Sequence, residues 1–146
     1  MAIYYAIDPA LNLLYYTGSG ESSADELLRV ERVAFADPLR KPGMSILFDG
    51  RPLIDFRIEV DDFGKLIRLN RQLAEQHYEL EKTAIVTRSS GASSLVNTIT
   101  TLAMDLPIKV CVFYIIPDAV GWLSLPAEAT QRIEQLQQQL LEQHPA

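Results

Sequence analysis

The feature that most constrains the fold is an alternation of short apolar runs with longer amphipathic stretches. Apolar, β-branched runs occupy residues 45–48, 82–87 and 108–115, and stretches long enough for a helix separate them. Short apolar runs bounded by turn residues indicate buried strands, and strands that alternate with helices indicate an α/β protein. The sequence therefore predicts a mostly parallel sheet with helices packed against it.

The N-terminus adds two more strands to this sheet. Residues 3–7 and 13–17 are rich in aromatic and β-branched side chains, and Asp8-Pro9-Ala10-Leu11-Asn12 between them is a turn sequence. We expect an N-terminal β-hairpin whose first strand is antiparallel at the edge of a five-stranded sheet. Alternate residues of a strand face opposite sides, so one tyrosine set is core. The other set is either an exposed patch that recruits a partner or the cover of a sheet face. The tyrosines are Tyr4, Tyr5, Tyr15 and Tyr16.

Helical patterns predict four to five helices. They cover about residues 23–36, 61–81, 95–106, a short segment opened by Pro117, and about 127–143. Ser23 and Glu26 fit a capping box, and Asp37-Pro38 ends the first helix. Residues 50–60 are interpreted as a packed loop, because Pro52 rules out a central strand there.

The length favours one domain over residues 1–146. Its core spans about residues 3–123, and a C-terminal helical extension spans about 124–146. The last helix docks on its own domain or pairs with a second subunit, which leaves a homodimer open. No basic segment resembles a signal peptide, and no apolar run approaches the roughly 18 residues of a membrane span. We therefore expect a cytoplasmic protein without membrane insertion.

The charge and composition argue against several classes of function. The net charge of −6 argues against a nucleic-acid partner or an anionic membrane surface. Cys111 is the single cysteine, and we interpret it as a small core residue. With His77 and His144 as the only histidines, we expect no metal site and no cofactor. The serines have no evident histidine partner, so we do not expect an enzyme.

Polar residues follow two predicted strands at the points where they end. Asp49, Gly50 and Arg51 follow residues 45–48, and a second polar loop follows residues 82–87. Ligands gather at the carboxyl ends of strands in open α/β sheets. Serine and glycine N–H groups ahead of a helix bind anions, and arginines add bidentate contacts. The candidate anion site comprises Asp49, Arg51, Arg88, Ser89, Ser90 and Gly91. The alternative is a solvated loop with an ion pair from Asp49 to Arg51 or Arg88.

Several short motifs together resemble one family. They are the Asp8-Pro9-Ala10-Leu11-Asn12-Leu13 turn, the glycine-then-helix step at 18–26, the connector from Asp37-Pro38 to Pro42-Gly43, Asp49-Gly50-Arg51, Ala84-Ile85-Val86, and the ending from Val112-Phe113 to Trp122-Leu123. Over about residues 3–123 the chain resembles the SpoIIAA-like (STAS/SEC14-like) family of small bacterial proteins. The resemblance implies a four- or five-stranded sheet with helices packed across it. Relatives of anti-sigma-factor antagonists act as interaction switches controlled by serine phosphorylation, and others are thought to bind small or lipid-like ligands.

The switch position of that family departs from the pattern in this chain. The antagonists carry an Asp-Ser-x-Gly motif after the third strand, and the nearest match is Asp61-Asp62-Phe63-Gly64. Asp62 occupies the serine position and has no hydroxyl to phosphorylate. Its single charge mimics phosphoserine only in part. The alternative is that Asp61 and Asp62 are ordinary acids at a helix N-terminus.

These observations lead to two hypotheses. The first is a non-catalytic, STAS-like interaction domain that binds a protein partner in a bacterial regulatory pathway. The second is a domain that binds a small anionic ligand, lipid-like or nucleotide, at the edge formed by Asp49, Arg51, Arg88 and Ser89.

Overall fold

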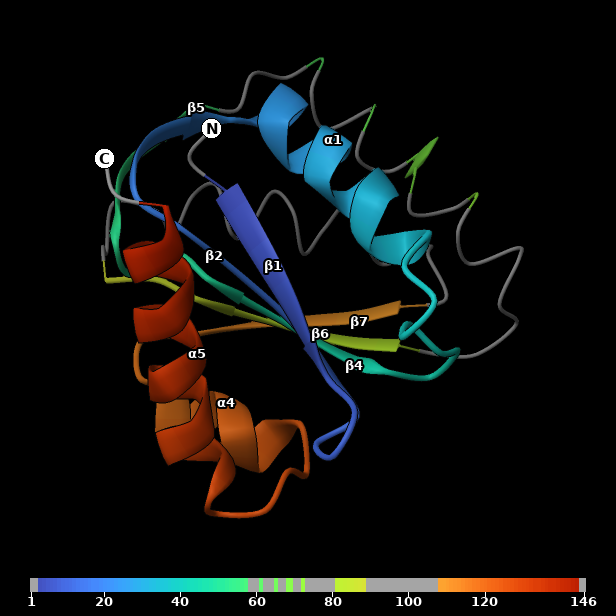
Figure 1. Ribbon diagram of the computed structural model, residues 1–146, viewed down its shortest axis with the longest axis vertical. Helices are drawn as coiled ribbons and strands as arrows, with labels where there is room; N and C mark the ends of the chain where they lie inside the picture. Colours follow the sequence, from blue (N-terminus) through green and yellow to red (C-terminus); the bar gives the residue numbers. More distant parts are fainter. Residues whose placement is uncertain are drawn as a thin grey trace.

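A five-stranded sheet forms the centre of the computed structural model, which describes residues 3–57, 61, 65, 68–69, 72, 81–88 and 108–144. The strands are β1 (Ile3–Asp8), β2 (Leu13–Gly18), β4 (Ser45–Asp49), β6 (Glu81–Val86) and β7 (Ile108–Phe113). Their order in the sheet is β1-β2-β4-β6-β7 (Figure 1). β1 pairs antiparallel with β2, and every other pair is parallel. The predicted hairpin, edge strand and mostly parallel sheet are confirmed.

The central position of β2 explains its apolar sequence, because all six of its residues are buried. Tyr15 faces one apolar cluster and Tyr16 faces the other, as the two-residue period of a strand requires. Both rings are fully buried, while Tyr4 and Tyr5 on β1 are half-buried. The opening tyrosines therefore cover both faces of the sheet rather than forming an exposed patch.

One face of the sheet is covered by α4 (Ile116–Trp122) and α5 (Ala129–Gln143) (Figure 1). α5 presents a stripe of buried side chains at helical spacing to this face: Ala129, Ile133, Leu136 and Leu140. It packs on β1 and β2 of its own chain. Of the two alternatives that the sequence leaves open for the C-terminal helix, the structure has the first, docking on its own domain.

The opposite face is covered in part by α1 (Ala24–Phe35), whose Leu28, Val30 and Ala34 are buried. The helix begins as predicted, but the capping-box hydrogen bond is not formed. Ser23 occupies the N-cap position in an extended conformation without a side-chain cap. Instead, the neighbouring Ser22 donates its hydroxyl to Glu26 Oε2 at 2.8 Å.

A second, two-stranded parallel sheet joins β3 (Gly20–Ser23) to β5 (Leu53–Arg57). Sequence analysis placed a packed loop at residues 50–60, and that prediction is wrong for β5. Pro52 lies one residue before the strand, where its missing N–H removes no ladder hydrogen bond. β3 is short and polar, so no apolar alternation reveals it.

The predictions for helix number and for the last strand need separate comment. Three helices have defined bounds within the described residues, against four to five predicted. The predicted helix at 95–106 lies outside the described residues, and Asp61, Lys65 and Leu69 from the helix predicted at 61–81 are helical. The sequence predicts a buried strand at residues 108–115, but residues 110–113 of β7 are half-buried, because β7 is an edge strand. Cys111 shares this half-buried position.

Among the residues that the structure describes, no helix combines the length and the apolar character needed to cross a bilayer.

Candidate functional site

The ends of β4 and β6 lie side by side on one rim of the sheet. Asp49 is in register with Val86, and Gly50 N donates to Val86 O at 2.8 Å. A Cβ atom at Gly50 would lie 3.2 Å from this carbonyl oxygen, so glycine lets the chain turn close to β6. The ends of β4 and β6 are therefore neighbours, which is the condition that the candidate anion site requires.

Asp49 is fully buried at this rim and accepts hydrogen bonds on both carboxylate oxygens. Its Oδ1 accepts from Arg51 N at 3.2 Å and from Arg51 Nε at 2.9 Å. Its Oδ2 accepts from Tyr15 OH at 2.7 Å, Arg51 Nη2 at 2.8 Å and Gln137 Nε2 at 2.9 Å. These donors fill the acceptor capacity of a carboxylate, so no lone pair is left for a metal ion or a substrate proton.

Arg51 uses all three guanidinium nitrogens within this cluster. Nε and Nη2 contact Asp49, and Nη1 donates to Glu134 Oε1 at 2.9 Å. The hydrogen bond to Asp49, opposed by burial and reinforced by Glu134, raises the pKa of Arg51. The pKa of Tyr15 is also raised, first by burial and then by the negative charge of Asp49. Both groups keep their protons, and the cluster is an ion pair that holds structure rather than an acid–base pair.

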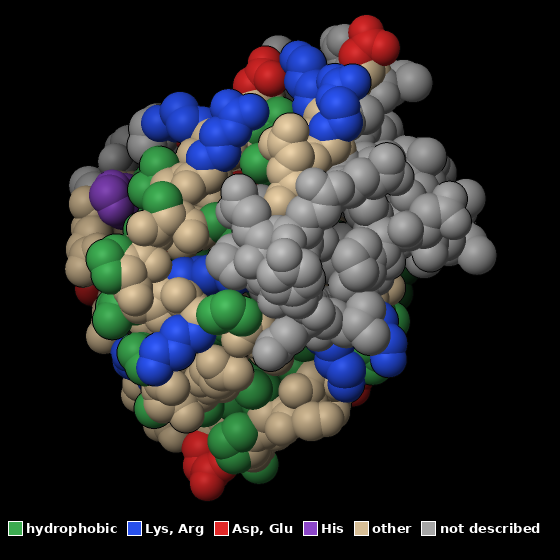
Figure 2. Space-filling view, turned by 90° about the vertical axis from the view of Figure 1, so that its right-hand side faces the viewer, with side chains coloured by type: hydrophobic (Ala, Val, Ile, Leu, Met, Phe, Trp, Pro, Cys, Tyr) green, Lys and Arg blue, Asp and Glu red, His purple; other side chains and the backbone are tan. Residues whose placement is uncertain are grey.

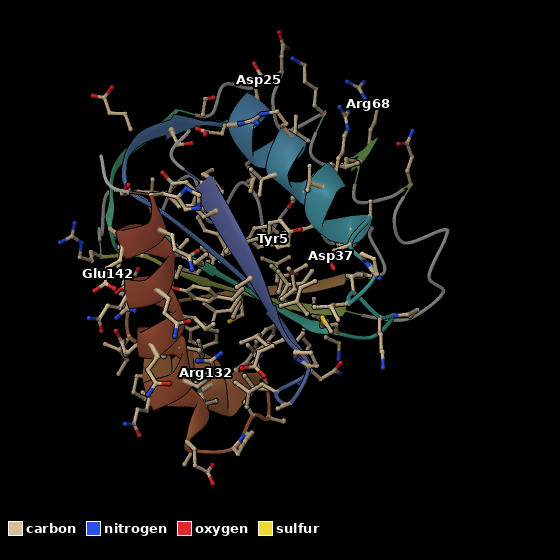
Figure 3. The ribbon with its side chains drawn as sticks, viewed as in Figure 1. Tyr5, Asp25, Asp37, Arg68, Arg132 and Glu142 are labelled. Carbon is tan, nitrogen blue, oxygen red and sulfur yellow. The ribbon has the colours of Figure 1, made fainter. Side chains whose placement is uncertain are left out.

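Two side chains of α5 complete the cluster, and a third binds the opposite end of the sheet. Gln137 and Glu134 reach Asp49 and Arg51, while Arg132 Nε donates to Asp8 Oδ2 at 2.8 Å (Figure 3). Asp8 also accepts from Leu11 N at 3.1 Å. Burial favours a higher pKa for Asp8, but the hydrogen bonds from Arg132 and Leu11 outweigh it, and the pKa is lowered. α5 is thus held by polar contacts at both ends of the strands.

No motif in the sequence singles out these α5 residues. The one sequence signal for them is that they are next to buried residues of the helix. Gln137 is adjacent to the buried Leu136, and Glu134 and Arg132 flank the buried Ile133. A polar residue next to a buried stripe lies at the edge of the interface, where it reaches partners on the sheet.

A second group of residues at the same rim is exposed to solvent. Thr87 N donates to Phe113 O at 3.0 Å, so the chain leaves β6 and β7 together. Arg88 is exposed, and Tyr114 and Ile115 are 54% and 52% exposed. We call Arg88, Tyr114 and Ile115 the carboxyl rim surface. Tyr114 and Ile115 were predicted as the buried end of the last strand, but β7 ends at Phe113.

The remaining predicted site residues are placed as follows. Asp49 and Arg51 pair with each other, which is the ion pair considered as the alternative to an anion site. Arg88 points into solvent and is not part of their cluster. Ser89, Ser90, Gly91 and the switch-position residue Asp62 lie outside the described residues. Anion binding by this loop and a role for Asp62 stay predictions. Within the described ranges, no three His, Cys, Asp or Glu side chains gather as metal ligands do.

Comparison with known proteins shows the fold. No family model and no curated protein matches the sequence. A solved structure from Shewanella loihica PV-4 does match, with a TM-score of 0.55 and 15% identity over 84% of this chain and 94% of that chain. It is an uncharacterized protein of the DUF3478 family with a SpoIIAA-like fold. The chain has a SpoIIAA-like fold. This supports the resemblance seen in the sequence motifs, and at this identity the likeness concerns the fold alone. In this SpoIIAA-like domain, the buried Asp49–Arg51 pair and the exposed carboxyl rim surface share one edge of the sheet.

Proposed function

We propose that this SpoIIAA-like domain is a non-catalytic interaction domain of the bacterial cytoplasm that binds a protein partner at the carboxyl rim surface. The observation that carries the proposal is the exposure of Tyr114 and Ile115, two adjacent large side chains that are each more than half exposed. Interface centres are enriched in aromatic residues and arginine, and Tyr and Arg are frequent hot spots. Arg88 supplies an exposed cation two residues after the end of the neighbouring strand β6.

The buried cluster beneath this rim supports a binding role. Asp49 and Arg51 satisfy each other and hold the start of the loop after β4. This loop shares its edge of the sheet with the carboxyl rim surface, so a partner that docks on this edge meets one loop that is already ordered. The same saturation argues against general acid–base chemistry at Asp49, because every acceptor position already has a donor.

A crosslinking experiment tests the proposal. A photoreactive amino acid replaces Tyr114 in the full chain, and a matched variant carries it at Gln131, an exposed position in the first turn of α5. We expect the Tyr114 variant to crosslink a defined partner that the Gln131 variant does not. With that partner purified, Tyr114→Ala should weaken its Kd about tenfold or more, as for an interface hot spot. Equal crosslinking at both positions, or an unchanged Kd, would contradict the proposal.

The exposed Arg88 also favours a second candidate function, binding of a small anion together with Ser89, Ser90 and Gly91. Arg51 contributes less than expected, since all its nitrogens already donate within the protein. Phosphate or a nucleotide should then raise the Tm, because a ligand that binds the native state stabilises it. Arg88→Ala should abolish this shift. If the shift survives in Arg88→Ala, the anion site is not at this rim.

A homodimer is a special case of the same proposal, with a second copy as the partner. Sedimentation at several protein concentrations distinguishes it, and Ile115→Asp should then yield monomers, because it places a charge in an apolar contact.

A further inference from the structure

The outer face of α1 carries a stripe of exposed residues opposite its buried side. These residues recur at helical spacing: Asp25, Arg29, Arg32, Val33 and Ala36 at the C-cap. Val33 is 55% exposed, although a valine is an unfavourable choice for a solvated helix position. Leu39, in the turn that follows the helix, is 53% exposed. The stripe thus combines two arginines with apolar side chains in solvent.

Cationic side chains from a second helical segment lie next to this stripe. Lys65 Nζ approaches Asp25 Oδ1 at 3.7 Å, which places residue 65 beside the first turn of α1. Arg68 lies alongside α1 and is exposed (Figure 3). We call Arg29, Arg32, Lys65 and Arg68 the basic surface. In the view of Figure 2, Lys and Arg side chains lie along the upper part of the described surface, with Asp and Glu side chains beside them.

Part of this positive charge is balanced locally and part is not. Lys65 is paired with Asp25, and Arg29 Nη2 lies 3.6 Å from Glu26 Oε1. Arg32 and Arg68 form no ion pair with any acid among the described residues. Arg32 and Arg68 are therefore two exposed cations without an acidic partner among the described residues, in a protein with a net charge of −6. Complementary charge steers a partner to such a surface and excludes partners of the same sign.

We infer that the basic surface docks an acidic protein segment that also carries apolar side chains. Acidic side chains can pair with Arg32 and Arg68. Apolar side chains can pack on Val33 and Leu39, each of which is more than half exposed. An extended polyanion such as nucleic acid fits less well, because it would meet the repulsion of the remaining acidic surface. The segment is therefore identified by mixed acidic and apolar chemistry.

This surface is distinct from the carboxyl rim surface of the proposed function. α1 packs on the face of the sheet opposite to α4 and α5 (Figure 1). The inference goes beyond the proposed function, since it assigns a second docking surface to the domain. An experiment can therefore contradict binding at one surface without contradicting binding at the other.

Fluorescence anisotropy with a labelled peptide that repeats Glu-Leu-Asp-Phe tests the inference on the full chain. We expect binding that weakens as salt screens the charges. We also expect no binding of the neutral analogue, which repeats Gln-Leu-Asn-Phe. The variant Arg32→Ala/Arg68→Ala should weaken binding by about tenfold or more, on the scale of lost interface hot spots.

A matched control carries the same change in net charge. Lys41→Ala/Lys109→Ala removes two exposed lysines outside the basic surface and should bind the peptide like the wild type. Val33→Ser should weaken binding severalfold without a change in charge, since it removes only apolar contact. The Tm of every variant is measured first, so that loss of the fold is not mistaken for loss of binding.

Three results would overturn the inference. The first is no binding of the acidic peptide by the wild-type chain. The second is an equal loss of affinity in the control variant, which would reduce the effect to net charge. The third is tighter binding of single-stranded DNA than of the peptide, with the same dependence on Arg32 and Arg68, which would make the surface a polyanion site instead.

Discussion

The guanidinium of Arg51 folds back onto the carboxylate of Asp49 two residues earlier, with Nε 2.9 Å from Oδ1 and Nη2 2.8 Å from Oδ2. This bidentate pair closes the loop at the end of β4 while Asp49 is fully buried. A buried ion pair gains little over apolar packing, but the loss of one member leaves the other charge without compensation. The pair is therefore a sensitive point for stability at the carboxyl rim.

Asp49→Ala should lower the free energy of unfolding by about 3–5 kcal/mol, because it leaves Arg51, Tyr15 and Gln137 without their acceptor. This loss of stability is measured by urea denaturation, with the fluorescence of Trp122 as the signal of unfolding. Glu134→Gln is the matched control, since Glu134 contacts Arg51 from a side chain that is 47% exposed. This control should cost about 0.5 kcal/mol or less. Equal costs would mean that burial does not set the strength of this cluster.

Tyr15→Phe should lower the free energy of unfolding by about 1–2 kcal/mol, because a buried donor to Asp49 is lost while the ring volume is kept. Tyr5→Phe removes a comparable 2.8 Å hydrogen bond to Asp37, but at a half-buried position. It should cost less in the same urea experiment. A larger loss of stability for Tyr5→Phe than for Tyr15→Phe would contradict the prediction that burial makes the Tyr15 hydrogen bond the stronger of the two.

Arg132→Gln should destabilise the protein at neutral pH by about 1 kcal/mol, since Arg132 is 40% exposed in its pair with Asp8. The native pKa of Asp8 is lowered, so this contribution is present above the unfolded pKa and is lost as the pH falls. Unfolding of wild type and variant should therefore differ at neutral pH and converge in acid. A difference that stays constant to about pH 2 would show that Arg132 acts without the charge of Asp8.

Most of the sheet is evident from local patterns in the sequence. Three local patterns have clear boundaries and leave few alternative secondary structures. They are the apolar run Ile46 to Phe48, the Asp8-Pro9 turn and the strand around Ala84. The adjacency of the β4 and β6 ends was a condition of the candidate anion site and not a deduction, because a parallel topology does not fix the order of the strands. The two-stranded sheet of β3 and β5 was missed for two reasons. β3 is polar and shows no apolar alternation. The alternation from Ile54 to Arg57 in β5 was interpreted as a packed loop, because Pro52 precedes it.

The candidate site was predictable only in part. Asp49 and Arg51 were singled out because an acid and a base follow an apolar strand, but their pairing depends on a turn geometry that the sequence does not specify. The contact from Gln137 crosses 88 residues of chain and depends on where α5 docks. Tyr114 and Ile115 were assigned to a buried run, because an apolar strand and the exposed residues after it have the same composition.

A carboxyl group lies within the buried stripe of α1, where its neighbours are apolar. Glu31 is half-buried, and its Oε2 is inaccessible to solvent and has no hydrogen-bond partner. The residues three or four positions away are Leu27, Leu28, Ala34 and Phe35, all buried or half-buried, and all but Leu28 belong to the apolar cluster on this face of the sheet. Burial raises the pKa of Glu31 from 4.5 to about 7. The native state therefore holds this proton more tightly than the unfolded state does.

The sign of the pH dependence follows from that difference. Between pH 4.5 and about 7 the unfolded state has released the proton and the native state retains it, so stability falls as the pH rises through this window. Glu31→Gln removes the titration and should gain on the wild type as the pH rises, by an amount on the order of 1–2 kcal/mol near pH 8. Urea denaturation at a series of pH values measures this gain. Glu142→Gln, at an exposed position on α5, is the control and should show no such trend. A constant offset between Glu31→Gln and wild type across the series would place Glu31 in water and contradict its burial.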